Sequence, residues 1–309
     1  MTVAPHVAVV ILHWGPPEVT ARCLRSLTAA AWPGRVTVIV VDNTQALAEE
    51  VAASAGPLDV HVIRPERNLG FADGCTRGMS AAVAKGADWL LLLNNDVVVE
   101  PGFLGPLLEA AEGGDDVGLV SPQIVHLGRP REAWYQGGTF SPWSGIPVQG
   151  HRRPAMAADG PAREVDYATG CAMLVRPAVI ERVGSFDGDF FAYCEDLDLS
   201  IRARRAGFRV MFAPGSTVSH DVSDEPHRAA LRIYYSTRNL LEVMRRHAAW
   251  YEWLGFGVNF LVRWVGFFVV LALVRGEPRD LEALGRGMLD FAGRKLGPSP
   301  RVADPRART

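Results

Sequence analysis

The chain has 309 residues, of which 48% are hydrophobic, so it is long enough to bury a large core without support from disulfides. Its formal net charge of −2 gives no sign of the strongly basic surface that nucleic-acid binding requires. The four cysteines lie far apart and lack metal-ligand spacing, which argues against a zinc site or a disulfide framework and favours a reducing cytosol.

The first 93 residues alternate between strand and helix patterns. Residues 7–12 predict a strand, and the apolar start of the chain lacks the basic region of a secretion signal. Pro16 and Pro17 then precede helically spaced leucines, so a helix follows. Further strands are predicted over residues 36–41, 60–63 and 90–93, and a further helix over residues 71–84. This alternation is typical of a doubly wound α/β fold with a mainly parallel sheet.

Four consecutive leucines at 90–93 end abruptly in Asn94, Asn95 and Asp96. An unbroken apolar run suits a strand buried on both faces, and its polar end then falls where open α/β sheets bind ligands. A carboxylate flanked by amides suits a hard divalent cation that also holds phosphate oxygens. An ordinary Asn/Asp turn explains the same residues, so partners elsewhere in the chain must decide.

The alternation fails after about residue 125. Residues 127–164 are rich in Gly, Pro and Arg and predict hairpins and loops over a site. Trp134 and Trp143 in this segment either stack on a sugar or pack beneath a loop. Regular secondary structure is predicted again after this segment. It consists of an apolar run over 170–175, helices from about 177 and 195, and a late strand over 208–212 that ends near His220.

The C-terminal part is helical and basic. Residues 223–309 carry 14 Lys and Arg against 9 Asp and Glu, a balance of +5, whereas residues 1–222 carry 18 against 25, a balance of −7. The segment 250–274 is strongly apolar, but its longest uncharged run, 264–274, is too short to span a bilayer. Its tryptophans and flanking arginines favour a segment lying in a membrane interface over a buried core helix. The basic tail consists of Arg294, Lys295, Arg301, Arg306 and Arg308.

Polar groups fall where successive elements should open onto one crevice: Asp42, Asp96, the Glu195-Asp196 pair and His220. Asp42 follows a β-branched run, where a carboxylate can accept hydrogen bonds from the base or ribose of a nucleotide. A turn or cap is the alternative role for this aspartate.

The helix that opens at Glu195 separates its acids. Asp198 can pair with Arg202 four residues later, which leaves Asp196 pointing to nearly the opposite side. An aspartate beside aromatic residues at the mouth of a crevice is a reasonable general base, because partial desolvation raises its proton affinity.

In their order along the chain, these motifs resemble family 2 glycosyltransferases, and most closely the rhamnosyltransferase-like bacterial members. The resemblance covers residues 7 to about 240. The segments that carry it are Asp42-Asn43, Arg67-Asn68-Leu69-Gly70, Leu92-Leu93-Asn94-Asn95-Asp96, Gly170-Cys171-Ala172-Met173, Glu195-Asp196-Leu197-Asp198, Arg204-Arg205-Ala206-Gly207 and His220.

The resemblance implies a GT-A fold, a mainly parallel, Rossmann-like mixed sheet flanked by helices. The catalytic domain would cover residues 1–222, with a nucleotide-sugar half at about 1–125 and an acceptor half at about 126–222. A helical extension, residues 223–309, would follow it.

The resemblance also assigns roles to single residues. Asp196 is the expected catalytic base in a pair with Glu195, and Asp96 with His220 would hold Mg²⁺ or Mn²⁺. The nucleotide-sugar residues would be Asp42, Asn43, Asn68, Asn95 and Asp96. The acceptor residues would be Trp134, Trp143 and Tyr193. Asn94 stands where many relatives have Asp, which implies a weaker metal site or one that relies more on water and phosphate. Asp73, Cys75-Thr76 and Thr44-Gln45 also depart from the family pattern, so the resemblance leaves the donor preference open.

The implied reaction is an inverting, metal-dependent transfer of rhamnose or another hexose from a dTDP- or UDP-linked donor to a glycan or lipid-linked acceptor in cell-surface polysaccharide synthesis. It would take place in the cytoplasm, at the inner face of the plasma membrane if the 250–274 segment contacts lipid. A soluble transferase acting on a small-molecule aglycone is the main alternative. Sugar nucleotidyl transfer is less favoured, because no basic Gly-rich phosphate loop is present. A non-catalytic binding protein would not need this full set of acids.

Overall fold

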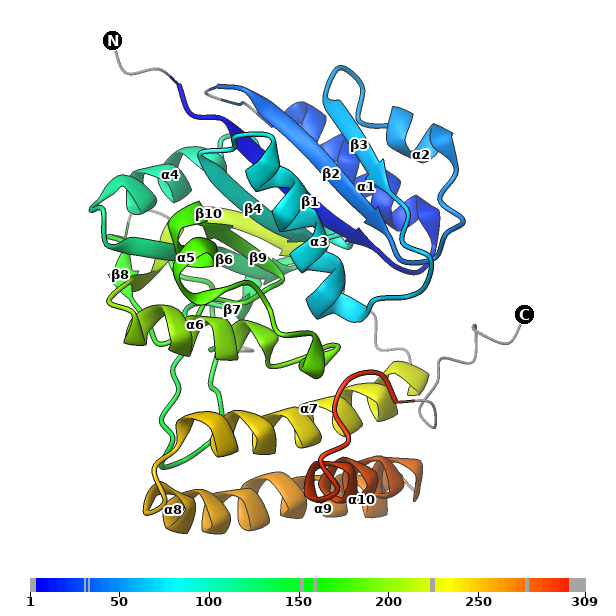
Figure 1. Cartoon of the computed structure of the whole chain (residues 1–309), viewed down its shortest axis with the longest axis vertical. Coiled ribbons are helices and arrows are strands. Elements are labelled where there is room, and N and C mark those ends of the chain that lie inside the picture. The colour runs from blue at the N-terminus through cyan, green and yellow to red at the C-terminus, as the bar shows by residue number, and fades with distance from the viewer. Residues whose placement is uncertain are drawn as a thin grey trace. The chain divides into compact units, whose positions relative to one another are not determined.

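The computed structural model describes residues 4–30, 32, 34–150, 153–157, 160–222, 226–275 and 278–299 (Figure 1). The chain forms two compact units. The first comprises residues 1–139, 148–186 and 196–222, and the second comprises residues 140–147, 187–195 and 223–309. That the segments 140–147 and 187–195 belong to the second unit was not predicted. Arg301, Arg306 and Arg308 of the predicted basic tail lie outside the described residues.

The first half of the first unit follows the predicted alternation closely. Its elements in chain order are β1 (Val7–His13), α1 (Pro17–Ala29), β2 (Val36–Asp42), α2 (Glu49–Ala53), β3 (Asp59–Ile63), α3 (Gly70–Ala84) and β4 (Trp89–Asn94). Residues of β1, β2 and β4 are almost wholly buried, as their unbroken apolar runs require. Gly78 lets α3 lie close to the sheet, because a Cβ there would come within 2.3 Å of Val10 Cγ1.

The second half of the first unit mixes strand directions. Its elements are β5 (Val97–Val99), α4 (Leu104–Glu112), β6 (Val117–His126), β7 (Arg129–Tyr135), β8 (Arg163–Glu164), β9 (Ala172–Val175), α5 (Pro177–Val183), α6 (Glu195–Arg205) and β10 (Arg209–His220). Figure 1 labels the strands β6, β7, β8, β9 and β10 of this half. The strand β10 ends at His220, as predicted, and a shift in its pairing with β6 between Ala213 and Thr217 interrupts the strand pattern near its middle.

One ten-stranded sheet organises this unit. Its order is β3-β2-β1-β4-β9-β6-β10-β5, with β7 beside β6 and β8 beside β10. The pairs β3-β2, β2-β1 and β1-β4 are parallel, as is β6-β10. The strand β9 runs antiparallel between β4 and β6. The pairs β10-β5, β10-β8 and β6-β7 are antiparallel as well. The predicted α/β class and mixed sheet are therefore confirmed, with the parallel pairing concentrated in the first half of the unit.

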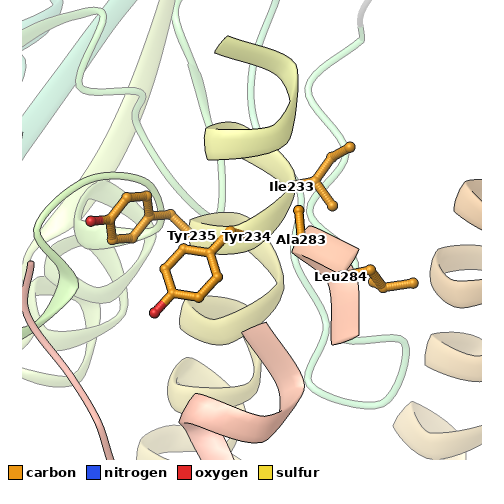
Figure 2. Close-up of a cluster of buried hydrophobic side chains, with 5 residues drawn as sticks. All are labelled: Ile233, Tyr234, Tyr235, Ala283 and Leu284. Carbon is orange, nitrogen blue, oxygen red and sulfur yellow. The ribbon is translucent and has the colours of Figure 1, made fainter. Parts of the chain in front are cut away.

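The second unit is built from helices. They are the 3₁₀ turn η1 (Gly188–Phe190), α7 (Pro226–His247), α8 (Glu252–Asn259), the π-helical turn η2 (Phe260–Val265), α9 (Gly266–Arg275) and α10 (Pro278–Ala292). Figure 2 shows one of its buried clusters, in which Ile233, Tyr234 and Tyr235 of α7 meet Ala283 and Leu284 of α10. The unit thus has a core of its own.

The elements α8, η2 and α9 form one long apolar helix. Residues Glu252–Val274 are the one candidate among the described residues that is long and apolar enough to cross a membrane, with a mean hydropathy of 2.1. Within the most apolar 18-residue stretch of this helix, only 11% is buried. The buried core helix that the sequence analysis gave as the alternative is therefore not what the structure shows.

Candidate active site

The ends of three parallel strands define the predicted site edge in the first unit. His13 at the end of β1 lies in register with Asp42 at the end of β2, and Leu12 of β1 lies in register with Asn94 at the end of β4. The polar side chains that follow these strands therefore emerge at one edge of the sheet, which is where α/β sheets bind ligands.

Asp42 is fully buried, and its carboxylate is hydrogen-bonded to the loop that follows it. Its Oδ1 accepts hydrogen bonds from Thr44 N at 3.0 Å, Thr44 Oγ1 at 2.6 Å and Gln45 N at 3.0 Å, and its Oδ2 accepts one from Leu47 N at 2.9 Å. Burial alone would raise the pKa of Asp42, but these hydrogen bonds outweigh it and hold the pKa below the ordinary value. The carboxylate thus shapes the 43–47 turn, and a direct contact with a nucleoside stays a prediction.

Asn43 joins the end of β2 to the loop before α3. Its Nδ2 donates to Gly70 O at 2.9 Å, and its Oδ1 accepts from Leu69 N at 3.2 Å. The side chain of Asn68 is exposed, and its Oδ1 accepts from Gly70 N at 2.8 Å. Of these two predicted nucleotide-sugar residues, only Asn68 therefore presents an accessible side chain.

The two asparagines at the end of β4 differ in their hydrogen bonds: the amide of Asn95 is paired, whereas the side-chain oxygen of Asn94 has no partner among the described residues. Asn95 Nδ2 donates to Thr20 Oγ1 at 2.9 Å and to Trp14 O at 3.1 Å. Thr20 Oγ1 in turn lies 2.6 Å from His13 Nδ1. Asn94 Oδ1 is buried and has no hydrogen-bond partner among the described residues. Asn95 is thus fixed by a buried network, whereas Asn94 keeps an oxygen for a ligand.

Asp96 and His220 form an ion pair. The antiparallel pairing of β10 with β5 places His220 opposite Val97, and His220 Nε2 lies 3.1 Å from Asp96 Oδ1. Trp134 packs edge-on against the His220 ring, with 4.8 Å between ring centroids. Burial alone would lower the pKa of His220, but the neighbouring Cys171 sulfur and the Asp96 carboxylate outweigh it and raise the pKa well above 6.5.

These groups suit a divalent metal bound together with a diphosphate. Among the described residues no cluster of three or more His, Cys, Asp and Glu is arranged to hold a metal alone. Asp96 and Asn94 Oδ1, which is unpaired among the described residues, nevertheless form an incomplete set of oxygen ligands, and His220 Nε2 would join them once binding of the ion displaces the proton that the Asp96 ion pair holds. Mg²⁺ and similar ions commonly take one or two carboxylates and complete their shell with water and substrate phosphate, so the residues present fit such an ion.

Asp196 lies at the first turn of α6. Its Oδ2 accepts from Gly170 N at 2.9 Å, and its Oδ1 accepts from Leu197 N at 2.8 Å. Burial raises the pKa of this carboxyl above the ordinary value, against the lowering effect of those two hydrogen bonds. The residue as a whole keeps part of its surface exposed, and its carboxylate is held in one orientation by the two hydrogen bonds. The predicted pairing of Asp198 with Arg202 is confirmed, with Arg202 Nε 2.7 Å from Asp198 Oδ2.

Two residues at this edge had no predicted role. Arg22 of α1 forms an ion pair with Asp221, whose backbone N–H donates to Asp96 O at 3.0 Å, so the arginine lies beside the Asp96 edge. Cys171 is buried next to His220, and burial raises the pKa of its thiol. Arg22 stands in no motif, and the position of Cys171 within one did not indicate its neighbour. Each reaches the site through packing between segments far apart in the chain.

The other predicted site residues belong to the second unit. Trp143 is 52% exposed and packs so closely on α8 that a Cβ at Gly255 would lie 2.5 Å from its ring. Tyr193 is 40% exposed and has a positive φ of 70°. Glu195 is buried, with 4% of its surface exposed. Trp143 and Tyr193 thus present aromatic surface, whereas Glu195 has little surface left for a ligand, and the catalytic and acceptor roles of all three stay predictions.

Comparison with known proteins decides the family. The family model described as "Glycosyltransferase like family 2" matches residues 4–252. The chain belongs to this family. A curated relative, the N-acetylglucosaminyl-diphospho-decaprenol L-rhamnosyltransferase of Mycobacterium tuberculosis, is 25% identical over 270 residues, which cover 79% of this chain and 86% of the relative. The family 2 glycosyltransferase resemblance seen in the motifs is therefore confirmed, and the chain is a glycosyltransferase.

Solved structures support the fold of this glycosyltransferase. S. aureus TarS 1-349 in complex with UDP-GlcNAc aligns with a TM-score of 0.61 at 14% identity, covering 94% of this chain and 82% of that one. The mannosyltransferase PcManGT from Pyrobaculum calidifontis, in complex with GDP-Man and Mn²⁺, aligns with a TM-score of 0.58 at 14% identity, covering 97% and 78%. The GT-A fold that the sequence predicted is confirmed by these neighbours.

Proposed function

We propose that this glycosyltransferase moves rhamnose or another hexose from a dTDP- or UDP-linked donor to a lipid-linked glycan, with inversion at the anomeric carbon. The observation that carries the proposal is the strand-end group of Asn94, Asp96 and His220 in a chain of this family. The relative that is named for a decaprenol-linked acceptor and an L-rhamnosyl product supports the choice of substrates.

The donor diphosphate would lie at the sheet edge. A Mg²⁺ or Mn²⁺ ion held by Asp96, His220 and Asn94 Oδ1 would neutralise the charge that develops on the leaving nucleoside diphosphate. Among solved neighbours, the mannosyltransferase structure contains Mn²⁺ with its GDP-Man, which supports a divalent ion here. Asn68, exposed next to the Asn43-braced loop, would contact the nucleoside side of the donor.

Asp196 would act as the general base. Its carboxylate accepts the proton of the acceptor hydroxyl while that oxygen attacks the anomeric carbon and the bond to the diphosphate breaks on the opposite face. One displacement without a covalent intermediate inverts the configuration. Gly170 N and Leu197 N hold the carboxylate in a fixed orientation, and burial strengthens it as a base.

Transfer itself tests the proposal. With dTDP-L-rhamnose and N-acetylglucosaminyl-diphospho-decaprenol, nucleoside diphosphate should be released only when both substrates are present. Equal release without the acceptor would indicate donor hydrolysis instead. Pyrophosphate release from a nucleoside triphosphate and a sugar phosphate would support the nucleotidyltransferase alternative.

We further propose that the long apolar helix of the second unit lies in the membrane interface, which would bring the enzyme to a lipid-linked acceptor. One face of this helix packs along α7: Phe256 and Phe260 meet Leu240 and Met244, and Trp264 Nε1 donates to Thr237 Oγ1 at 3.0 Å. The other face is apolar and exposed, each side chain by 58–79%. Its apolar side chains are Leu254, Val258, Leu261, Val262, Phe267, Val270, Leu273 and Val274, and Arg263 is exposed among them.

An interfacial position fits these contacts better than a transmembrane one. If the helix crossed a bilayer, α7 would enter with it, together with Arg238, Glu242 and Arg246, whose charges are costly in hydrocarbon. Trp250 and Tyr251 are exposed at the start of the helix and suit the headgroup level. Exposed Arg294 and Lys295 on the same unit favour anionic lipid.

Vesicle flotation tests this surface. The full chain should float with phosphatidylglycerol-containing vesicles, and the double substitution Leu261→Gln and Phe267→Gln should reduce the bound fraction at least about tenfold, since each large apolar side chain contributes about 1.5–3 kcal/mol on burial. Leu289→Gln is the matched control, because Leu289 is 72% exposed on α10 but lies outside this face.

That control should float like the unmodified chain. Equal recovery of the unmodified chain and the double variant in the soluble fraction would overturn the membrane proposal. A concentration-dependent dimer lost in the double variant would assign the face to a second copy instead.

A further inference from the structure

The loop that leads into the catalytic acids is held by an asparagine of α7. Asn239 is fully buried, and its Nδ2 lies 2.9 Å from Phe190 O, 2.8 Å from Ala192 O and 2.7 Å from Tyr193 O. Two N–H groups are therefore shared among three backbone carbonyls of one short segment. So dense a set of bonds from one side chain fixes the path of the loop rather than merely filling space.

Arg238, the preceding residue, holds both the asparagine and the loop. Its Nε donates to Asn239 Oδ1 at 2.9 Å, which sets the orientation of the amide. Its Nη2 donates to Asp189 O at 3.1 Å and Phe190 O at 3.0 Å, and its Nη1 donates to Gly297 O at 2.7 Å. Arg238 is 1% exposed, and its guanidinium satisfies backbone carbonyls from two separate segments. Burying a cation costs free energy, so we infer that these hydrogen bonds serve to fix the conformation of the loop.

The loop itself is strained. Phe191, Tyr193 and Cys194 have φ values of 62°, 70° and 70°, a region that L-residues rarely adopt. Three such residues within four positions persist only where surrounding contacts enforce them. The Phe191 ring stacks on Tyr235 of α7 with 5.3 Å between centroids, which adds a third contact from the same helix. The strained segment continues directly into Glu195 and Asp196.

We propose that Arg238 and Asn239 are positioning residues for catalysis, which hold the 189–194 loop in the strained path that sets Asp196 and presents Tyr193. This inference rests on the proposed function, because it assigns Asp196 as the base. It goes beyond that function by placing a determinant of turnover on α7, in residues outside the proposed donor and metal group.

A purely structural role would give a different pattern. If the pair served only the stability of the helical unit, its loss would lower melting temperature and the amount of folded enzyme, but the folded fraction would turn over normally. A positioning role predicts a lower kcat per folded molecule with little change in the KM for the donor, since the donor residues lie on other segments.

The test compares four full-length proteins: the unmodified chain, Asn239→Ala, Phe191→Ala and Thr237→Val. Thr237 is the matched control, because it is fully buried on the same helix and loses one side-chain hydrogen bond, but its partner Trp264 lies on η2 rather than in the loop. Phe191 is only partly buried, so Phe191→Ala carries the test if Asn239→Ala does not fold.

Two readouts are measured: hydrogen exchange of amides in residues 188–195, and kcat and donor KM with dTDP-L-rhamnose and N-acetylglucosaminyl-diphospho-decaprenol. We expect Asn239→Ala to lower kcat at least about tenfold and Phe191→Ala at least about threefold, because small misplacements of a reacting group have large effects on rate. Donor KM should stay within about twofold in both, and loop exchange should accelerate in both. Thr237→Val should change neither kcat nor loop exchange.

The proposal is overturned if Phe191→Ala, and Asn239→Ala where it folds, keep a kcat per folded molecule within about twofold of the unmodified chain. Unchanged hydrogen exchange in the loop also overturns it. An equal loss of kcat in Thr237→Val also overturns it, because the effect would then be general to α7. If the unmodified chain transfers no sugar, the proposed function fails instead, and the exchange measurement alone decides whether α7 holds the loop.

Discussion

Asp196→Asn should abolish most turnover while leaving donor binding intact. General base catalysis typically contributes about 10²–10⁴-fold in rate, and an amide cannot accept the acceptor's proton, so we expect kcat to fall by about that factor. The fold should survive, because the oxygen of the substituted amide can still accept one of the two backbone N–H groups that bond the carboxylate. Loss of the other bond should cost about 1 kcal/mol of stability.

The pH dependence gives this substitution a second signature. Burial raises the pKa of Asp196, so its base form is lost at a higher pH than for an ordinary aspartate, and kcat should fall as the pH drops through that raised value. The effect of pH on the stability of the fold has the opposite sign. A carboxyl whose pKa is higher in the folded state binds its proton more tightly there, so its contribution favours the folded state at low pH and is lost as the pH rises through the folded pKa.

Asp166→Asn is the matched control. Asp166 also lies against α6, where its Oδ1 is 2.9 Å from Arg204 Nη1, but it forms a partly exposed ion pair. Such pairs contribute about 0–1 kcal/mol, so this variant should keep kcat within about twofold. Full transfer activity in Asp196→Asn would contradict the assignment of the base.

Asp96→Asn should remove metal-dependent binding and turnover together. The substitution keeps the shape of the side chain but replaces the one carboxylate in the Asn94, Asp96 and His220 group. Because a bound divalent ion supplies several kcal/mol of charge stabilisation and each 1.36 kcal/mol is tenfold in rate, we expect kcat/KM to fall at least about a hundredfold. The rise in melting temperature produced by dTDP with Mn²⁺, relative to dTDP alone, should disappear.

The control for this variant is an aspartate that pairs with the opposite end of β10. Asp116 forms a two-point ion pair with Arg209 at the start of β10, with both N–O distances at 2.8 Å, whereas His220 ends that strand. Asp116→Asn should therefore leave the Mn²⁺-dependent shift unchanged. An Mn²⁺-dependent shift retained in Asp96→Asn would show that the ion is held elsewhere.

The sequence was most informative where structure is local. The unbroken apolar runs ending in Asp42 and in Asn94 predicted two parallel strands and the edge where they end, because strand burial leaves a direct mark on residue type. The pairing of Asp198 with Arg202 followed from helical spacing alone.

The sequence was least informative where partners are distant. Nothing in residues 172–175 predicts that β9 runs antiparallel between β4 and β6, because strand direction depends on connections far along the chain. The full satisfaction of Asp42 by its own loop could not be seen either, since a turn aspartate and a nucleotide-binding aspartate have the same sequence context. Arg238 and Asn239 lie in an ordinary amphipathic helix pattern, so their bonds to the 189–193 backbone left no signal.

The most direct test of the central claim is the configuration of the transferred sugar. Proton NMR of the product formed from dTDP-L-rhamnose and the decaprenol-linked acceptor would give the anomeric configuration of the new glycosidic bond. A single displacement driven by Asp196 predicts a product whose configuration is inverted relative to the donor. A product with the donor's own configuration would contradict it, because retention requires a second displacement or attack on the same face that the diphosphate leaves.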